Sequence, residues 1–500
     1  MSFNSFAFLL GVLPISLVIY WVLRSRGKCS AAQWFMTGAS LVWYGFSFWE
    51  TSPLALPILL VSLIVDYLLL KKMFSLTKIS ARRVLLTVGV VFNILLICLS
   101  RFWVNIPGAS FYTFSAIAIL VEAYRVNVCE VSVREYAFFL TFFPKMMQGP
   151  IAIPSDSLFK GNGRERLDIE TVFRAVVLFS IGLFKKVIIA ETFGAAVVYA
   201  YSDLQHIHTG EALIVLFASA IQLYNDFSGY CDMGMAIAML FGFDLPLNFD
   251  SPYQASNICD FWKRWHITLT RFFTKYLYIP LGGNRKGKLR MYLNFVIIFL
   301  VSGLWHGFSL TYVVWGISQG VMFIIVRMIL DMVKKKKTAD SCKAAQGNCN
   351  KNAGFERCFG VRKIGKGLLH GGAVALNFIY FCLTLNVFRA ESLSQAGRMF
   401  QSIGECWFPR LNVTLANCFN IDELWYVIKV LHLDSWEYGI YIVPVFLLVV
   451  MFVVTFFFPN AVKFAKKCRI GVPVMLLTAV MLIWSIVSLN GVATYIYVNF

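Results

Sequence analysis

The chain has 500 residues, of which 59% are hydrophobic and 14% are charged. A soluble domain has about 45–50% apolar and about 25% charged residues, so this composition excludes an ordinary water-soluble protein and indicates many segments that face lipid. The net charge is +19, and the basic residues lie mostly in short loops between apolar runs. This placement is typical of the cytoplasmic loops of a membrane protein rather than of a nucleic-acid-binding surface. The alternative is an acidic partner that docks on the basic face.

Apolar runs that could cross a bilayer, which takes about 20 residues, recur along the whole chain. The clear runs cover residues 6–23, 53–70, 84–103, 307–330, 371–388, 437–458 and 471–488. Runs with polar interruptions cover residues 34–48, 111–124, 136–153, 172–194, 211–224, 233–243 and 291–305. Such interruptions persist in a bilayer only where protein buries them, so we expect about 11 to 14 embedded helices, some of which do not cross fully. The first run lacks a small-residue cleavage site and should remain as a helix.

Clusters of Lys and Arg orient these helices, because cytoplasmic loops carry an excess of both residues. The clusters lie at 24–28, 71–83, 285–290, 334–337 and 463–469. One topology places all of them in the cytoplasm, with both termini and the segment 391–435 outside. The Lys-rich stretch 331–370 has no apolar periodicity and predicts a mobile cytoplasmic loop. In the outer segment, Cys406 and Cys418 either form a disulfide or remain free thiols.

Polar residues inside apolar runs are functional candidates because their burial is costly. The first cluster, YNDFSGYCD at 224–232, contains Asp226 and Tyr230. It forms either a hydrogen-bond network between helices or the wall of a pocket. The second cluster, NICDFWKRWHITL at 257–269, begins at Asn257 and contains His266. On a continuous helix, His266 shares one face with two tryptophans that precede it.

The third cluster, SGLWHG at 302–307, contains Ser302, Trp305 and His306 and ends the run 291–305. About 15 helical residues rise about 22 Å, less than the about 30 Å of the hydrocarbon core, so we expect His306 to lie within the membrane. Desolvation favours neutral imidazole, the form that a general base needs. The alternative is a histidine that is hydrogen-bonded between helices. Of the six histidines, only His266 and His306 are embedded among aromatic residues.

Several stretches of the chain are similar to the membrane-bound O-acyltransferase family, most closely to its bacterial branch of alginate O-acetylation and teichoic acid D-alanyl transfer proteins. They are SFYTFSAIAILVEAYR (110–125), FFPKMMQGPI (142–151), DFSGYCDMGMAIAMLFGFDLPLNFDSPY (226–253), DFWKRWHITLTRFFTKYLYIPLGGNRKG (260–287), SGLWHG (302–307), FRAESL (388–393) and YIYVNF (495–500). The similarity covers most of residues 100–330 and the end of the chain.

The resemblance implies a single membrane domain over residues 1–500, built as a ring of tilted and re-entrant helices around a central tunnel. His306 matches the essential histidine of the family, His266 its second histidine, and Tyr497 a tyrosine that is suspected of carrying the acyl group. It also implies an acyl thioester co-substrate from the cytoplasm, either acyl-CoA or an acyl carrier protein, and a hydroxyl acceptor from the other side. No bound cofactor or metal is implied. A further candidate partner is an extracytoplasmic SGNH-type transferase.

We therefore predict an O-acyltransferase of the bacterial cytoplasmic membrane that moves an acyl group, acetyl as first choice, toward an exported polysaccharide or wall polymer. His306 is the expected general base, and His266 orients the donor or stabilises the oxyanion. The expected substrate-binding or supporting residues are Asp226, Tyr230, Asn257, Ser302, Trp305 and Tyr497.

Three alternative functions remain open at this stage. One is transfer of D-alanine from a carrier protein to teichoic acid. The second is a transporter that uses the same embedded polar residues as a substrate path, although we find no internal repeat. The third is a scaffold that recruits a separate transferase.

Overall fold

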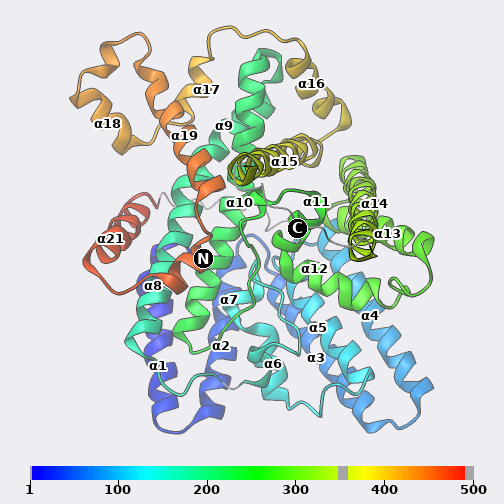
Figure 1. Ribbon diagram of the computed structural model, residues 1–500. Coiled ribbons are helices and arrows are strands. Elements are labelled where there is room, and N and C mark those ends of the chain that lie inside the picture. Colours follow the sequence, from blue (N-terminus) through cyan, green and yellow to red (C-terminus); the bar gives the residue numbers. More distant parts are fainter. Residues whose placement is uncertain (1–2, 162, 347–357, 490–500) are drawn as a thin grey trace.

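The computed structural model describes residues 3–161, 163–346 and 358–489, and the regular elements in these ranges are all helices (Figure 1). Seven of the described helices are long and apolar enough to cross a membrane. Two shorter apolar helices, Ala109–Tyr124 and Val472–Val487, accompany them. This architecture agrees with the predicted all-α class.

The N-terminal helices form one side of the molecule, drawn in blue and cyan in Figure 1. They are the π-helical segment η1 (Phe8–Val12), α1 (Leu13–Ser25), α2 (Cys29–Phe48), α3 (Ala55–Ser75), α4 (Ile79–Phe102), α5 (Ala109–Tyr124), α6 (Val133–Thr141) and α7 (Phe143–Met146). Ile15, Val61 and Leu95 are examples of their exposed large apolar side chains. Contiguous exposed apolar surface of this kind marks contact with lipid or protein. The predicted run 136–153 is broken into α6, α7 and an irregular segment.

The next helices lead up to α10 (Thr209–Leu240), which is the most buried of the candidate spans. They are η2 (Ser157–Lys160), α8 (Ile169–Phe184), η3 (Lys185–Ala190), α9 (Glu191–Ser202) and η4 (Leu204–His206). The prediction of two separate runs, 211–224 and 233–243, is wrong because α10 continues through the polar cluster between them. The π-helical segment η3 supplies the reason, since its two lysines neutralise the two aspartates of the polar cluster in α10.

These ion pairs are buried between η3 and α10. The Nζ of Lys185 lies 2.7 Å from an oxygen of Asp232, and Lys186 pairs with Asp226. A buried charge is tolerated when an opposite charge and hydrogen bonds accompany it. Close packing of α8 on α10 adds to the contact, because a Cβ on Gly229 would lie 2.7 Å from the carbonyl oxygen of Gly182. The polar cluster at 224–232 therefore joins helices, which is the first of the two interpretations given for it in the sequence analysis.

The following helices build the other side of the molecule. They are η5 (Pro252–Gln254), α11 (Ile258–Arg264), α12 (Ile267–Phe273), η6 (Thr274–Tyr278), α13 (Lys288–His306), α14 (Leu310–Gln346) and α15 (Cys358–Arg389). In Figure 1, α14 and α15 are viewed close to their axes, whereas α1–α4 run mainly in the plane of the picture. The two groups are therefore steeply inclined to each other. The predicted loop 331–370 is wrong in its described part, because α14 and α15 extend into it; residues 347–357 lie outside the described ranges.

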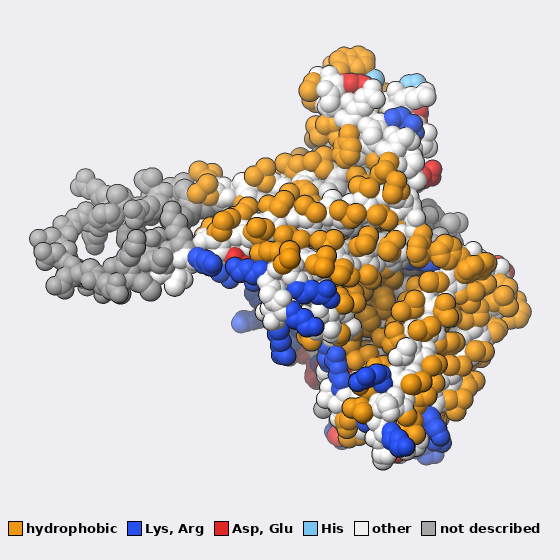
Figure 2. Space-filling model, turned by 90° about the vertical axis from the view of Figure 1, so that its right-hand side faces the viewer, with side chains coloured by type: hydrophobic (Ala, Val, Ile, Leu, Met, Phe, Trp, Pro, Cys, Tyr) orange, Lys and Arg blue, Asp and Glu red, His pale blue; other side chains and the backbone are white. Residues whose placement is uncertain are grey.

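The remaining helices include the segment that was predicted to lie outside the membrane. They are α16 (Leu393–Gly404), α17 (Val413–Asn417), α18 (Asp422–Val430), η7 (Leu433–Ser435), η8 (Gly439–Tyr441), α19 (Ile442–Phe457), α20 (Ala461–Lys467) and α21 (Val472–Val487). Helices α16–α18 gather at the end of the molecule away from α1–α6 (Figure 1), and the Lys and Arg side chains in Figure 2 concentrate on the other side. Cys406 and Cys418 are free thiols.

Candidate active site

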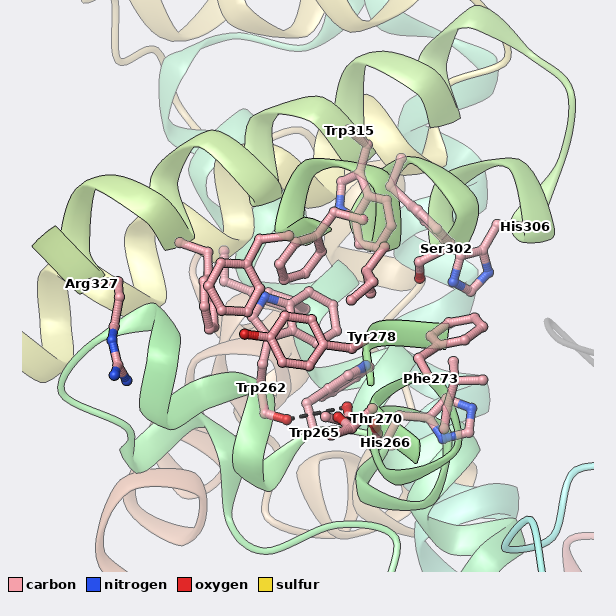
Figure 3. Close-up of a pocket in the computed structure, with 18 of the residues that line it drawn as sticks. Trp262, Trp265, His266, Thr270, Phe273, Tyr278, Ser302, His306, Trp315 and Arg327 are labelled. Atoms are coloured by element: carbon pink, nitrogen blue, oxygen red, sulfur yellow. Dashed lines mark hydrogen bonds between the residues drawn. The ribbon is translucent and has the colours of Figure 1, made fainter. Parts of the chain in front are cut away.

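A cavity of about 270 Å³ lies among α11, α12, α13, α14 and α15. Its walls are mainly aromatic and aliphatic, and His266, His306 and Ser302 belong to its lining. Figure 3 shows both imidazoles at one end of this cavity and Arg327 at the other end. Asn284 also lines it and directly precedes the basic loop 285–290. The cavity therefore leads from the basic side of the protein to the two histidines.

His306 is the last residue of α13 and is buried in an aromatic cage. The ring centroids of Trp305, Phe388 and Trp315 lie 4.5, 4.8 and 5.5 Å from that of its imidazole. The guanidinium of Arg101 donates a hydrogen bond of 2.8 Å to the carbonyl oxygen of Trp305 and so satisfies one of the carbonyls that a helix end leaves open.

The length of α13 corrects the argument that placed His306 in the membrane. The helix has 19 residues, because it begins at Lys288, and such a helix rises about 28 Å rather than about 22 Å. Length alone therefore does not place His306 short of the far surface. Its burial comes from packing, and α13 meets α14 so closely that a Cβ on Gly303 would lie 2.4 Å from the carbonyl oxygen of Tyr312.

His266 occupies the break between α11 and α12. Its backbone is left-handed, with φ of 44°, so 257–269 is not one continuous helix and the shared helical face with the two preceding tryptophans does not form. A non-glycine residue holds this conformation only where its surroundings enforce it. The imidazole is buried, and its ring centroid lies 4.8 Å from that of Phe227. Its Nδ1 lies 3.1 Å from Oδ1 of Asn248.

The indole of Trp305 connects the two histidines. Its ring centroid lies 6.2 Å from that of His266 and 4.5 Å from that of His306. The two imidazoles are thus neighbours across one aromatic ring and face the same cavity. This is an arrangement that can act on a single reacting centre, because both groups reach the same enclosed space.

A second cavity of about 450 Å³ lies on the other side of a thin wall. Three residues, Leu223, Leu385 and Phe388, line both cavities. Charged and polar residues, among them Arg389, Glu391 and Gln395, also contribute to the lining of the second cavity. Its walls come from α9, α10, α14, α15 and α16, so it lies toward the segment 391–435.

The other predicted site residues occupy different places. Ser302 lines the first cavity. Asp226 forms the buried ion pair with Lys186, and the ring of Tyr230 stacks on that of Phe3 at a centroid distance of 4.8 Å. Neither belongs to the described lining of the two cavities.

Asn257 begins α11 as its N-cap, since its side-chain oxygen accepts a 3.0 Å hydrogen bond from the Asp260 N–H. Such caps stabilise a helix start. Trp305 lies between the histidines, as described above. Tyr497 lies outside the described residues.

Asn248, Arg101 and Phe388 contact the two histidines or their neighbour Trp305 but were not singled out from the sequence. Asn248 and Phe388 do fall within two of the stretches that carry the family resemblance, DFSGYCDMGMAIAMLFGFDLPLNFDSPY and FRAESL. An asparagine, an arginine and a phenylalanine are common residues, and only their positions in the fold distinguish them.

Comparison with known proteins gives a consistent family. The sequence model described as "MBOAT, membrane-bound O-acyltransferase family" matches residues 43–350. A peptidoglycan O-acetyltransferase of Helicobacter pylori is 32% identical over 381 residues, which is 67% of this chain and 72% of the relative. The probable alginate O-acetylase of Pseudomonas aeruginosa is 32% identical over 297 residues, covering 59% of this chain and 51% of the relative.

A more distant relative is the teichoic acid D-alanyltransferase of Bacillus subtilis, 24% identical over 246 residues, which covers 47% of this chain and 62% of the relative. The family match runs from within α2 to beyond the end of α14 and includes both histidines and most of the lining of the first cavity, whose α15 residues lie outside it. The predicted fold class and enzyme class are thereby confirmed. The chain belongs to the membrane-bound O-acyltransferase family and is a multi-pass membrane O-acyltransferase.

Proposed function

We propose that the chain transfers an acyl group, acetyl as first choice, from a thioester on its basic side to a hydroxyl group of an exported polysaccharide or wall polymer. The observation that carries this proposal is the position of His306, whose imidazole lines the first cavity and contacts Phe388, a residue that also lines the second cavity. The relatives named peptidoglycan O-acetyltransferase and alginate O-acetylase support acetyl as the group and a polysaccharide as the acceptor.

His306 acts as the general base in this proposal. It takes the proton from the acceptor hydroxyl, whose oxygen attacks the thioester carbonyl carbon. The C–O bond forms, the C–S bond breaks, and the leaving thiolate takes the proton back from the imidazolium. General base catalysis contributes about 10²–10⁴-fold. Alignment of both substrates in an enclosed apolar cavity adds to this rate.

The first cavity is the donor side in this proposal. Arg327 lies at the end away from the histidines (Figure 3), and the loop 285–290 adds basic residues beside Asn284. These cations attract either the phosphates of acyl-CoA or the acidic surface of an acyl carrier protein, because long-range charge steers association. The thioester would reach His306 along the apolar walls, and the acceptor would approach from the second cavity.

We also propose that the protein forms one domain over residues 1–500 in the bacterial cytoplasmic membrane, with the segment 391–435 outside. An SGNH-type transferase on that side would complete delivery to the polymer. Asp226, Tyr230 and Asn257 would support the site through the helix contacts described above, and Tyr497 is the candidate for a transient acyl carrier.

The alternative acyl group is D-alanine, which the teichoic acid D-alanyltransferase relative favours. Both groups form esters that mild base cleaves, and the released acid identifies the group. Acetate would support the main proposal, and D-alanine would support the alternative.

The test replaces His306 with Ala in a deletion strain of the host bacterium. Loss of a general base lowers the rate by about 10²–10⁴-fold, so ester-linked acid on envelope polymers should fall to background when measured by base release and mass spectrometry. His206→Ala is the matched control, because His206 is an exposed histidine outside both cavities. Immunoblots of membranes confirm equal amounts of protein. Undiminished ester with His306→Ala would exclude the proposed base and favour a transporter or a scaffold.

A further inference from the structure

Asn248 holds the turn that carries His266. Asn248 is fully buried and lies 18 residues before His266 in the chain. Its backbone carbonyl accepts a 2.9 Å hydrogen bond from the Ile267 N–H. Its side-chain oxygen accepts hydrogen bonds from the N–H and the hydroxyl of Thr268, at 3.3 and 2.9 Å. These contacts enforce the left-handed backbone of His266, which otherwise costs energy.

The same contacts fix the orientation of the Asn248 amide. The backbone N–H of Thr268 can only donate, so the atom that faces it must be the amide oxygen and not the NH₂ group. The NH₂ group then points the other way and donates to Sγ of Cys231 at 3.2 Å. The thiol of Cys231 in turn donates to the carbonyl oxygen of Gln148 at 3.3 Å. Every bond in this chain has one donor and one acceptor.

The orientation of the amide determines the state of the imidazole. Because Oδ1 of Asn248 is an acceptor, Nδ1 of His266 must carry the hydrogen in their 3.1 Å contact. In a neutral imidazole with the hydrogen on Nδ1, Nε2 has a free lone pair and accepts hydrogen bonds. This Nε2 is buried and has no hydrogen-bond partner among the residues that the structure describes, although the residue lines the first cavity.

We propose that Asn248 is a positioning residue that holds His266 as the Nδ1-protonated tautomer, so that His266 presents a hydrogen-bond acceptor to the thioester donor. This inference rests on the proposed function and selects between the two roles predicted for His266. A lone pair on Nε2 repels an oxyanion, whereas it binds an N–H group. The group that fits is an amide N–H of the pantetheine-type arm that carries a thioester in both acyl-CoA and acyl carrier proteins.

The first test observes the tautomer directly and needs no activity. Solid-state ¹⁵N NMR on [¹⁵N]histidine-labelled protein in lipid bilayers separates protonated from unprotonated ring nitrogens, and comparison with His266→Gln assigns the signal among six histidines. We expect protonated Nδ1 and unprotonated Nε2 for His266. A hydrogen on Nε2, or a doubly protonated ring, overturns the proposal even if the enzyme transfers acyl groups normally. Conversely, a His306→Ala variant that still transfers acyl groups would contradict the proposed function but would leave the tautomer of His266 unaffected.

The second test uses the direction of a pH profile. In Asn248→Asp a carboxylate replaces the amide beside Nδ1, and an adjacent anion favours the imidazolium. The acceptor role predicts that transfer from acetyl-CoA in inverted membrane vesicles falls about tenfold or more as pH decreases and recovers as pH rises, relative to the wild type. An oxyanion role predicts the opposite, because an imidazolium donates from Nε2. Activity that rises toward low pH, or an unchanged profile, overturns the proposal.

Asn93→Ala and Asn248→Ala form a matched control pair. Asn93, in α4, is equally buried, donates to Asp66 and to the carbonyl oxygen of Gly89, and does not belong to the described lining of either cavity. Both variants remove a buried amide, so both lose stability. Only Asn248→Ala should lower transfer per folded molecule and change the tautomer signal of His266. An equal effect of Asn93→Ala on the NMR signal or on transfer per folded molecule would reduce Asn248 to a purely structural residue and overturn the proposal.

Discussion

The side chain of Phe388 separates the two cavities and touches the proposed base. Its ring centroid lies 4.8 Å from that of His306 and 5.1 Å from that of Tyr312. We expect Phe388→Ala to join the cavities and to admit water to the thioester, because Phe388 is the largest of the three side chains that line both cavities. Transfer should fall and hydrolysis should rise, so the ratio of thiol released to ester formed increases several-fold with acetyl-CoA in membrane vesicles.

Phe388→Leu is the control for this prediction, since leucine keeps an apolar side chain in the wall. Loss of a large core side chain costs about 3–5 kcal/mol where it is fully enclosed, and the loss here should be smaller because the ring borders on space at both sides. A ratio of hydrolysis to transfer that stays at the wild-type value in Phe388→Ala would show that Phe388 does not seal the wall.

The sequence identifies the two histidines that line the first cavity but not the residues that orient and enclose them. His266 and His306 stand out because imidazoles are rare among apolar residues. Asn248 does not stand out, because its contact with His266 exists only when the segment around Asn248 packs against the turn at 264–268. Asp226 shows a different limit. A carboxylate in an apolar run left a helix-joining network and a pocket wall as alternatives, and the structure pairs it with Lys186, a partner 40 residues away that no local pattern reveals.

At the scale of elements, the buried ion pairs between η3 and α10 give a prediction on stability. Removal of one member leaves an uncompensated buried charge and costs about 3–5 kcal/mol, whereas replacement of both members by apolar residues is close to neutral. We therefore expect Lys186→Met alone to lower the yield and the melting temperature of detergent-purified protein. The double variant Lys186→Met with Asp226→Leu should recover both.

The double variant also separates structure from chemistry. Recovered acyl transfer would agree with a purely structural role of Asp226, which is the role that its contact with Lys186 indicates. Recovered stability without transfer would instead give Asp226 a direct part in the reaction. Lys185, whose side chain pairs with Asp232 on the same two elements, remains unchanged in both variants.

The limits of sequence prediction at this scale follow from tertiary contacts. Runs of apolar residues gave α3, α4 and α19 within a few residues, because lipid-facing helices are set by their own composition. The polar interruption in α10 was taken for a break, yet the lysines of η3 let the helix continue. The opposite happened at 257–269, where helical spacing was continuous but Asn248 breaks the helix at His266.

At the scale of the whole molecule, two native cysteines test the topology. Cys406 is exposed in the segment 391–435, and Cys29 is exposed beside the basic cluster 24–28. The loop-charge rule places basic clusters in the cytoplasm, so a membrane-impermeant maleimide should label Cys406 but not Cys29 in intact cells. In inverted vesicles the result should be reversed, as mass spectrometry of tryptic peptides will show.

Cys406→Ser and Cys29→Ser identify the labelled site in each preparation. Labelling of both cysteines from the same side would contradict the topology and, with it, the assignment of donor and acceptor sides to the two cavities. The class of the protein does not depend on this outcome, because composition and recurring apolar runs already indicated a multi-pass helical protein and the family match confirms it.

The wall formed by Leu223, Leu385 and Phe388 has a consequence for the permeability of the bilayer. If reactants arrive from opposite faces and meet at a partition one side chain thick, only the small acyl fragment changes compartment, and each carrier returns the way it came. Such an enzyme exports a chemical group without an alternating pump cycle. The partition prevents ions and metabolites from crossing the membrane during turnover, because the acyl group crosses only by the exchange of one covalent bond for another.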